Sequence, residues 1–260
     1  MLEHWLPEDF LKTIVLFRIP NSVGDMVPHG TGVLLNVENV FVLVTCKHIV
    51  IDSTTNKKIL GLEAVVNKVD GTRSIKNIDS IHSKFSLKWF FHRDPKVDLA
   101  VSPIAIEEGI DDIKLFPKKD IQKSENIFTG DDVFFLGFPL GLGVDNVDKI
   151  SPLVRGGIVS QKNRNSTYLI DANVYPGSSG SPVFFKPTFA KMEGGTINIG
   201  GATRGIKLIG IVSQSINVGN NNSGLGVVQS SDLLMDIINN DEFKNILPQT
   251  EKAQESEEKT

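Results

Sequence analysis

Short apolar stretches separated by polar turns recur along most of the 260-residue chain. Many of these stretches are rich in β-branched residues, which favour strands. They fall at residues 13–19, 31–37, 40–45, 62–66, 73–75, 85–91 and 97–104, and then at 133–138, 153–159, 167–170, 183–185, 206–212 and 227–229. Because strands do not alternate with helical segments, the pattern predicts antiparallel β-barrels or sandwiches rather than a parallel α/β sheet.

Three further segments, a linker, a helix and a tail, complete the predicted architecture. Residues 107–129 are polar, which predicts a linker between two β units, one over residues 1–118 and one over 119–247. A helix is predicted after the last strand, because apolar residues with helical spacing follow a serine cap. These apolar residues are Leu233, Leu234, Ile237 and Ile238. Residues 248–260 are polar and charged and are predicted to be disordered.

Net charge and cysteine content limit which partners and which cellular compartment are expected. The net charge is −4, so the chain lacks the basic field that nucleic acid or an anionic membrane surface attracts, and neither is expected as a partner. No apolar run approaches the roughly 20 residues of a membrane helix. The single cysteine, Cys46, excludes an internal disulfide and is typical of a reducing compartment. With no signal peptide visible, a cytoplasmic location is expected.

The stretch NVYPGSSGSP at residues 173–182 has the composition of a tight turn that presents one hydroxyl, that of Ser179. Gly177 and Gly180 permit backbone angles that other residues resist, and Pro176 fixes its own φ. Successive N–H groups in such a turn can face one concavity and hold an anion. A serine beside donors for a developing oxyanion is half of an acyl-transfer site.

The other half requires a base and an acid. All five histidines precede Ser179, which excludes the serine–acid–histidine order of α/β-hydrolases. His48 is the strongest candidate base, because it follows an apolar strand and would lie at a barrel rim. Asp98 is the matching acid, since an isolated carboxylate between two apolar neighbours would be costly without a partner. Asp94 is the alternative acid, in a polar loop. The remaining histidines, His4, His29, His82 and His92, lie in polar or loop-like surroundings.

Several segments carry a resemblance to a known family, in collinear order over nearly the whole chain. They are GTGVLL at 30–35, LVTCKHIV at 43–50, DPKVDLAV at 94–101, FFLGFPLGLG at 134–143, GGIVS at 156–160, DANVYPGSSGSP at 171–182, LIGIVSQSI at 208–216 and GLGVVQSSDLL at 224–234. With them the chain resembles the trypsin-like (chymotrypsin-fold) serine proteases, and among these the Do-like or HtrA-like peptidases. The resemblance implies two six-stranded antiparallel β-barrels, an active site between them and a C-terminal helix.

The resemblance also implies roles for the candidate residues. His48 would be the general base and then acid, Asp98 would orient it, and Ser179 would be the nucleophile. The N–H groups of Gly177 and Ser179 would form the oxyanion hole. The expected function is that of a serine endopeptidase, which hydrolyses peptide bonds in a protein or peptide substrate through an acyl-enzyme. No metal and no cofactor is expected.

The resemblance also implies which residues set substrate specificity. Asn173, six residues before Ser179, would lie at the base of the specificity pocket, and a neutral amide does not balance an arginine or lysine side chain. The same resemblance assigns substrate binding to Ser213, Gln214, Ser215 and Gly226. The first three would form the pocket wall and pair with the substrate backbone as an added strand. Small or aliphatic side chains are expected before the scissile bond.

Some positions depart from the family pattern. Ser178 replaces the aspartate that pairs with a newly cut N-terminus in trypsin, so activity is expected without proteolytic maturation. Ser181 replaces a common glycine and should be tolerated, and no PDZ domain is expected to follow.

The alternative function is a latent or inactive binding or chaperone-like module that needs a partner to form the oxyanion hole. An esterase-like hydrolase would differ only in its substrate.

Two loop segments, a glycine-rich segment and the cysteine complete the sequence pattern. Residues 186–205 are expected to form a surface hairpin or a flexible flap beside the cleft, and residues 219–224 a mobile loop. The glycine-rich segment 137–143 lacks the Lys-Ser/Thr pair of a phosphate-binding loop. Cys46 and His48, two residues apart, do not by themselves make a metal site.

Overall fold

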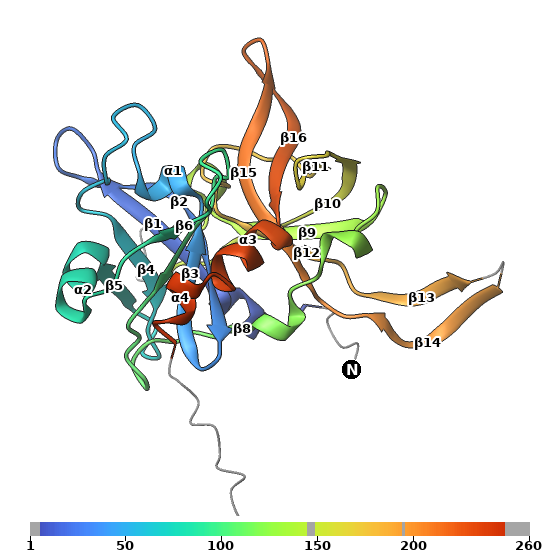
Figure 1. Ribbon diagram of the computed structural model, residues 1–260, viewed down its shortest axis with the longest axis horizontal. Coiled ribbons are helices and arrows are strands. Elements are labelled where there is room, and N and C mark those ends of the chain that lie inside the picture. Colours follow the sequence, from blue (N-terminus) through green and yellow to red (C-terminus); the bar gives the residue numbers. More distant parts are fainter. Residues whose placement is uncertain (1–5, 145–148, 194–195, 248–260) are drawn as a thin grey trace, which may run out of the picture.

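The computed structural model describes residues 6–144, 149–193 and 196–247, and its strands form two β units and a separate hairpin (Figure 1). The first unit is an eight-stranded sheet with the path β5-β4-β1-β2-β3-β7-β6, and β8 pairs with β2 outside this path. Its strands are β1 (Ile14–Pro20), β2 (Met26–Val37), β3 (Val40–Thr45), β4 (Glu63–Asn67), β5 (Arg73–Asn77), β6 (Phe90–Phe91), β7 (Ala100–Pro103) and β8 (Phe116–Pro117).

The second unit is a closed barrel with the strand order β10-β11-β16-β15-β12-β9. Its strands are β9 (Asp132–Gly137), β10 (Leu153–Lys162), β11 (Thr167–Asp171), β12 (Pro182–Phe185), β15 (Leu208–Val218) and β16 (Asn221–Ser230). The helix α3 (Ser231–Ile238) follows the barrel, and its apolar residues are buried as predicted. The all-β, chymotrypsin-like architecture is therefore confirmed. The first unit has eight strands rather than six, because the two-residue strands β6 and β8 add to it.

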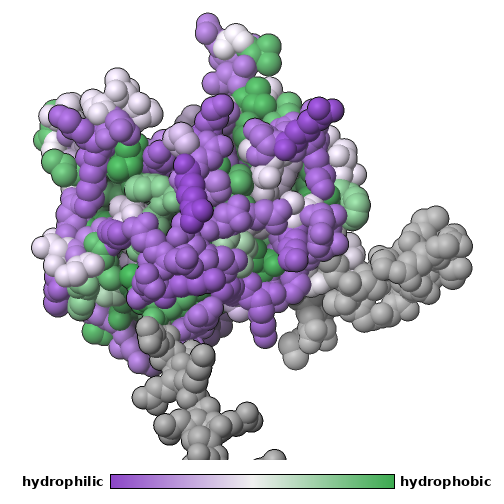
Figure 2. All heavy atoms as spheres, viewed as in Figure 1, coloured by the Kyte–Doolittle hydropathy of each residue, from purple (hydrophilic) through white to green (hydrophobic). Residues whose placement is uncertain are grey.

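The segment between the units contains two short 3₁₀ helices, η2 (Lys118–Asp120) and η3 (Ser124–Asn126). The expected boundary between residues 118 and 119 lies within it and stays a prediction. A further short helix, α4 (Asp241–Lys244), follows α3. The tail expected to be disordered lies outside the described residues. No helix in the described part of the chain is long and apolar enough to cross a membrane. The face seen in Figure 2 is largely hydrophilic, with smaller hydrophobic areas between the polar ones.

A tight turn between β2 and β3 reverses the chain, so that β3 leads to the helix that carries the candidate base. Glu38 and Asn39 both have positive φ angles, 51° and 67°. Two such residues form a type I′ turn, whose twist matches that of the strands it joins. β3 then runs antiparallel to β2 and ends at Thr45, directly before the short helix α1 (Lys47–Val50) that carries His48.

Aromatic packing joins the N-terminal segment to both units. The 3₁₀ helix η1 (Glu8–Thr13) carries Phe10, whose ring contacts Phe116 of the first unit and Phe184 of the second. The ring centroids lie 5.8 and 4.9 Å away in edge-to-face geometry, which is favourable for aromatic pairs. One hydrophobic cluster therefore extends across both units, and a second cluster fills the closed barrel.

One predicted strand was wrong in most of its length. Residues 85–91 were expected to be extended, but the helix α2 (Ile78–Phe85) ends at the first of them, residues 86–89 form a turn and an irregular segment, and only Phe90–Phe91 forms a strand. The Asn77 side chain caps the helix by accepting a hydrogen bond from the N–H of Ser80 at 2.9 Å. Ile78 and His82, four residues apart, form its buried face.

Two predicted loops are hairpins. Strands β13 (Thr188–Glu193) and β14 (Thr196–Arg204) pair into a two-stranded sheet that extends away from the barrel (Figure 1). This agrees with the surface-hairpin expectation for residues 186–205. Most of residues 219–224 belong to β16, because the β15–β16 hairpin turns at 219–220 and pairs Val218 with Asn221. The expectation of a mobile loop there is replaced by a long, projecting hairpin.

Candidate active site

The predicted catalytic residues meet in a cleft between the two units. This cleft has a volume of about 680 Å³, and His48, Asp98 and Ser179 all line it. Its other lining residues are Lys47, Ile51, Ser53, Asn56, Pro95, Val97, Pro176, Ser213, Gln214 and Ser215. His48 and Asp98 come from the first unit and Ser179 from the second. The fold thus brings together three residues that are far apart in the sequence.

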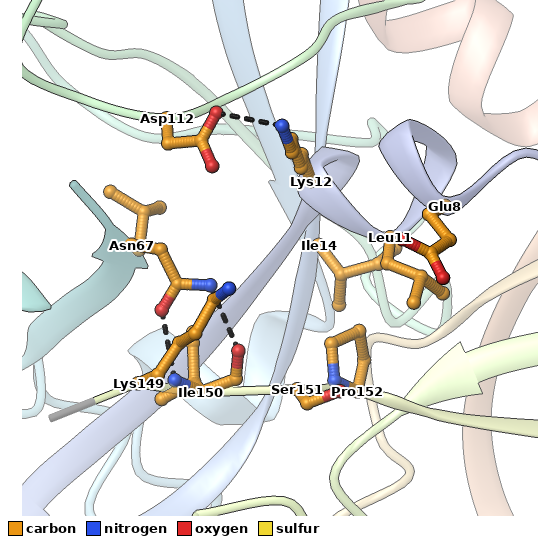
Figure 3. Close-up of a pocket in the computed structure, with 11 residues that line it drawn as sticks. Glu8, Leu11, Lys12, Ile14, Asn67, Asp112, Lys149, Ile150, Ser151 and Pro152 are labelled. Atoms are coloured by element: carbon orange, nitrogen blue, oxygen red, sulfur yellow. Dashed lines mark hydrogen bonds and ion pairs between the residues drawn. The ribbon is translucent and has the colours of Figure 1, made fainter. Parts of the chain in front are cut away.

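A second hollow lies away from these residues (Figure 3). Its walls come from η1, the end of β4 and the segment before β10. The Asn67 side chain bridges it by pairing with both the N–H and the carbonyl of Ile150, at 2.8 and 2.9 Å. Lys12 pairs with Asp112 at 3.0 Å. The Asn67 contacts join the first unit to the second, whereas the Lys12–Asp112 pair lies within the first. The hollow contains none of the predicted site residues.

Asp98 fixes both the backbone and the ring of His48. Oδ1 of Asp98 accepts a hydrogen bond from the His48 backbone N–H at 3.0 Å, and Oδ2 lies 2.7 Å from Nδ1 of the ring. An ionised carboxylate only accepts hydrogen bonds, so it favours the tautomer with a proton on Nδ1. Nε2 of the neutral ring is then available as a base. The two side chains are 36% and 25% exposed, so solvent and substrate can reach them.

Cys46 is buried close to this pair. Its thiol donates to the carbonyl of Val212 in the second unit, at 3.1 Å. Burial raises the pKa of the Cys46 thiol well above its usual range, and the nearby Asp98 carboxylate raises it further. Ligand atoms of Cys46, His48 and Asp98 lie within 4.8 Å of one another, a grouping that the sequence spacing did not suggest. Each of these atoms already has a partner, so a metal ion would have to displace existing bonds.

The turn that carries Ser179 requires its two flanking glycines. Gly177 and Gly180 have φ angles of 89° and 87°, in the region that favours glycine. A Cβ atom at Gly177 would lie 2.5 Å from the carbonyl oxygen of Phe138. A Cβ atom at Gly180 would lie 1.8 Å from the carbonyl oxygen of Thr31. The turn is therefore packed tightly against both units.

In this turn the carbonyl groups are hydrogen-bonded, whereas two of the N–H groups have no acceptor within the described part of the chain. The four consecutive carbonyl groups from Pro176 to Ser179 all accept hydrogen bonds. Their donors are, in chain order, Leu140 N (2.7 Å), Thr31 Oγ1 (3.0 Å), Ser181 N (3.0 Å) and Thr31 N (2.8 Å). The N–H groups of Ser178 and Gly180 donate to the carbonyls of Tyr175 (3.0 Å) and Val212 (2.8 Å). Among the described residues, none accepts a hydrogen bond from the N–H of Gly177 or Ser179. The two predicted oxyanion donors are thus the unpaired ones.

The orientation of the Gly177 N–H follows from its peptide plane. The carbonyl of this peptide is that of Pro176, and it is held by the N–H of Leu140. In a trans peptide the C=O and N–H groups point in opposite directions. The Gly177 N–H therefore points away from Leu140. Leu140 itself has a φ of 54°, so the glycine-rich segment 137–143 adopts a strained conformation where it supports the turn.

The Ser179 hydroxyl donates to the carbonyl of Ser213 at 3.1 Å. No hydrogen bond joins it to His48 in the part of the chain that is described. Hydrogen bonds of this kind are often formed only in the substrate complex.

The predicted pocket wall lines the cleft, but the other two specificity residues do not. Ser213, Gln214 and Ser215 belong to β15, whose pairing with β12 ends at Ile211. This leaves one edge of β15 open at the cleft. Asn173 is exposed with a φ of 51°, and neither it nor Gly226 is among the residues that line the cleft.

A valine that the sequence did not single out lies beside Gly226. A Cβ atom at Gly226 would lie 2.4 Å from Cγ2 of Val174, and Val174 is buried. Val174 therefore fills the space that the missing Gly226 side chain leaves. Its position next to Asn173 in the turn sequence was the only signal available.

The two serines that depart from the family pattern are both buried. Ser178 is fully buried, and its hydroxyl accepts a hydrogen bond from the N–H of Tyr175 at 3.4 Å. No charge is present at this position. The Ser181 hydroxyl has no hydrogen-bond partner among the described residues, and a Cβ atom at Gly137 would lie 2.0 Å from it. Ser181 is thus accommodated against a glycine of β9.

Comparisons with known proteins agree with this geometry. Residues 30–186 match the family model of the trypsin-like peptidase domain. The serine endoprotease from Yersinia pestis is similar in structure, with a TM-score of 0.53 and 18% sequence identity. The similarity covers 88% of this chain and 62% of that one, so the chain spans somewhat less than two thirds of the relative's length. At this identity the similarity concerns the fold. No curated protein sequence matches the chain.

Proposed function

Because the chain belongs to the trypsin-like peptidase family, a family of serine proteases, we propose that it is a serine endopeptidase with His48, Asp98 and Ser179 as its catalytic triad. The observation that carries this proposal is the hydrogen bonding of the 176–180 turn. Every carbonyl from Pro176 to Ser179 is bonded, while the N–H groups of Gly177 and Ser179 have no acceptor among the described residues. A collapsed oxyanion loop would instead place a carbonyl where these donors point.

The proposed reaction uses each group of the cleft. Ser179 Oγ attacks the carbonyl carbon of the scissile bond while Nε2 of His48 takes its proton. The oxyanion receives hydrogen bonds from Gly177 and Ser179, and Asp98 stabilises the imidazolium. His48 then passes the proton to the leaving amine. Water, deprotonated by His48, hydrolyses the acyl-enzyme and regenerates Ser179.

The substrate is proposed to be an extended segment of a protein or peptide. The open edge of β15 at Ser213–Ser215 can take such a segment as an added strand, with main-chain hydrogen bonds giving affinity. We place the specificity pocket beside the lined part of the cleft, at Gly226, as the resemblance implies. Val174 then occupies space in it, and small side chains before the scissile bond are favoured. The assignment of Asn173 to the pocket base and a cytoplasmic site of action stay predictions.

A latent enzyme is the second candidate, and one observation favours it. The Ser179 hydroxyl is bonded to Ser213 rather than to His48, so the nucleophile is not yet aligned with its base. In that case a substrate or partner would have to turn the side chain before acylation.

Labelling by a fluorophosphonate probe at neutral pH separates the two candidates. Wild type and Ser179→Ala are compared by intact mass, and peptide mapping distinguishes Ser179 from Ser178 and Ser181. Rapid labelling confined to Ser179 in the wild type supports the endopeptidase. A folded wild type that stays unlabelled until a peptide is added supports the latent enzyme, and one that never labels contradicts both.

A further inference from the structure

Thr31 lies at the junction of the two units and was not among the residues expected to have a role in the site. It belongs to β2 in the first unit and is fully buried. Its backbone N–H donates to the carbonyl of Ser179 at 2.8 Å. Its hydroxyl donates to the carbonyl of Gly177 at 3.0 Å. One residue of the first unit thus holds two carbonyls of the turn that forms the proposed oxyanion hole.

The hydroxyl also holds the segment that supports the turn from the other side. It accepts a hydrogen bond from the N–H of Phe138 at 3.1 Å. Two residues further on, the N–H of Leu140 holds the carbonyl of Pro176 and so orients the Gly177 N–H. The Thr31 hydroxyl therefore ties the supporting segment and the turn to one point.

Thr31 is itself held in place. The Thr45 hydroxyl donates to the Thr31 carbonyl at 2.7 Å. A Cβ atom at Gly137 would lie 2.9 Å from the Thr31 hydroxyl, and one at Gly180 would lie 1.8 Å from its carbonyl oxygen. The branched side chain of threonine has few χ1 rotamers, which keeps the hydroxyl aimed at its partners. The Thr31 side chain thus lies in a closely packed, uncharged environment, and its backbone and hydroxyl groups all form hydrogen bonds.

We infer that Thr31 is a positioning residue that keeps the oxyanion hole in its donor-outward form by bonding the Gly177 carbonyl from the first unit. The inference rests on the proposed function for its effect on rate. In physical terms, if the Gly177 carbonyl lost its donor, the peptides on either side of it could rotate. The two unpaired N–H groups would then no longer converge on one point.

Two substitutions at this position and one matched control test the inference. Thr31→Val keeps the shape but removes the hydroxyl, and Thr31→Ser keeps the hydroxyl but removes the methyl group. Thr13→Val is the control, because the Thr13 hydroxyl is also buried and bonds a backbone carbonyl of the first unit, that of Phe10 at 2.8 Å, away from the cleft. All three are compared with wild type for Tm, kcat, KM and inhibition by a peptide aldehyde, whose tetrahedral adduct occupies the oxyanion hole.

We expect Thr31→Val to lower kcat by about 10–100-fold with little change in KM, somewhat less than the loss of one whole oxyanion donor. Aldehyde inhibition should weaken by a similar factor. Thr31→Ser should stay within about threefold of wild type in kcat, because it keeps the bond that matters. Thr13→Val should lower Tm without lowering kcat. If Thr31→Val lowers Tm as Thr13→Val does but keeps kcat and aldehyde affinity, the residue is merely structural and the inference is overturned.

A measurement without turnover separates this inference from the proposed function. Hydrogen exchange over residues 175–181 is followed in the Ser179→Ala background, with and without Thr31→Val. Faster exchange confined to the turn and to residues 137–143 supports the positioning role even if the protein cleaves no substrate. Unchanged exchange in these two segments contradicts it, whatever the activity of the wild type.

Discussion

The two halves of the candidate active site are held in place by different means. In the first unit, the Asp98 carboxylate fixes His48 through two side-chain contacts at 2.7 and 3.0 Å. In the second unit, Ser179 and its neighbours are held through the main chain of their turn, whose four carbonyl groups accept hydrogen bonds from three backbone N–H groups and the Thr31 hydroxyl. The acid–base half should therefore respond mainly to side-chain chemistry. The nucleophile half should respond mainly to backbone geometry.

Asp98→Asn tests the acid–base half with the largest expected effect. The amide offers an N–H₂ group where the carboxylate only accepts, which favours the wrong tautomer of His48. We expect kcat to fall by about 10⁴-fold while Tm changes little. Steady-state kinetics and thermal unfolding of the same preparation measure both. A variant that retained more than about a tenth of wild-type kcat would exclude Asp98 as the orienting acid.

Gly177→Ala tests the nucleophile half. The new Cβ atom would meet the Phe138 carbonyl oxygen at 2.5 Å, at a φ of 89° that alanine resists, so the peptide must shift. We expect kcat to fall by about 10²–10³-fold, as when one oxyanion donor is lost. Gly156→Ala in β10 is the control, because no atom lies within 4 Å of its added Cβ. Equal effects of the two substitutions would contradict the proposed role of the turn.

Acid stability should distinguish the two units, since all five histidines lie in the first half of the chain. The His82 ring is buried in α2, beside Ser102 at 2.8 Å. Burial lowers the pKa of His82 from 6.5 to about 4, and the positive charge of Lys58 adds to this effect. Because the folded protein binds this proton less readily than the unfolded chain, stability is full above about pH 6.5 and declines as the pH falls towards 4.

The expected loss from His82 is about 3 kcal/mol over this window. Urea unfolding of wild type and His82→Gln between neutral pH and pH 4 measures it, with the variant expected to show a shallower decline. Hydrogen exchange at low pH should show the first unit opening before the closed barrel. If both proteins lost stability in parallel, His82 would not be the source.

Val174→Ala is expected to have the smallest effect and concerns specificity alone. If the specificity pocket lies at Gly226, as we propose, removing two methyl groups beside it enlarges that pocket. We expect kcat/KM for a substrate with leucine before the scissile bond to rise about tenfold relative to one with alanine. Val154→Ala, on the exposed face of β10, should leave this ratio unchanged. An unchanged ratio in Val174→Ala would place the pocket elsewhere.

Local signals in the sequence predicted the parts of the site that local chemistry determines. The glycines around Ser179, the apolar neighbours of Asp98 and the strand before His48 each indicated its position. Contacts of Thr31 and Val174 could not be predicted in this way. Thr31 meets Gly177 146 residues further along the chain, and that contact exists only once the two units have packed.

The same distinction applies to the fold. Strands with β-branched apolar runs were found at most of the expected positions. The helix α2 was missed because its eight residues show little more than one helical repeat, Ile78 and His82, and because Phe85 continued the apolar pattern of the stretch that follows. Its cap, Asn77, is the signal that would have found it.

The single cysteine allows the opening of the molecule to be timed. Cys46 lies in the first unit, is fully buried and bonds Val212 of the second. A maleimide therefore reaches it only when the two units separate or the site unfolds locally. Its rate of alkylation under native conditions therefore reports how often the protein opens at this site. A covalent inhibitor that spans the cleft should lower this alkylation rate. The ratio of the rates without and with the inhibitor would measure how strongly occupation of the cleft suppresses opening.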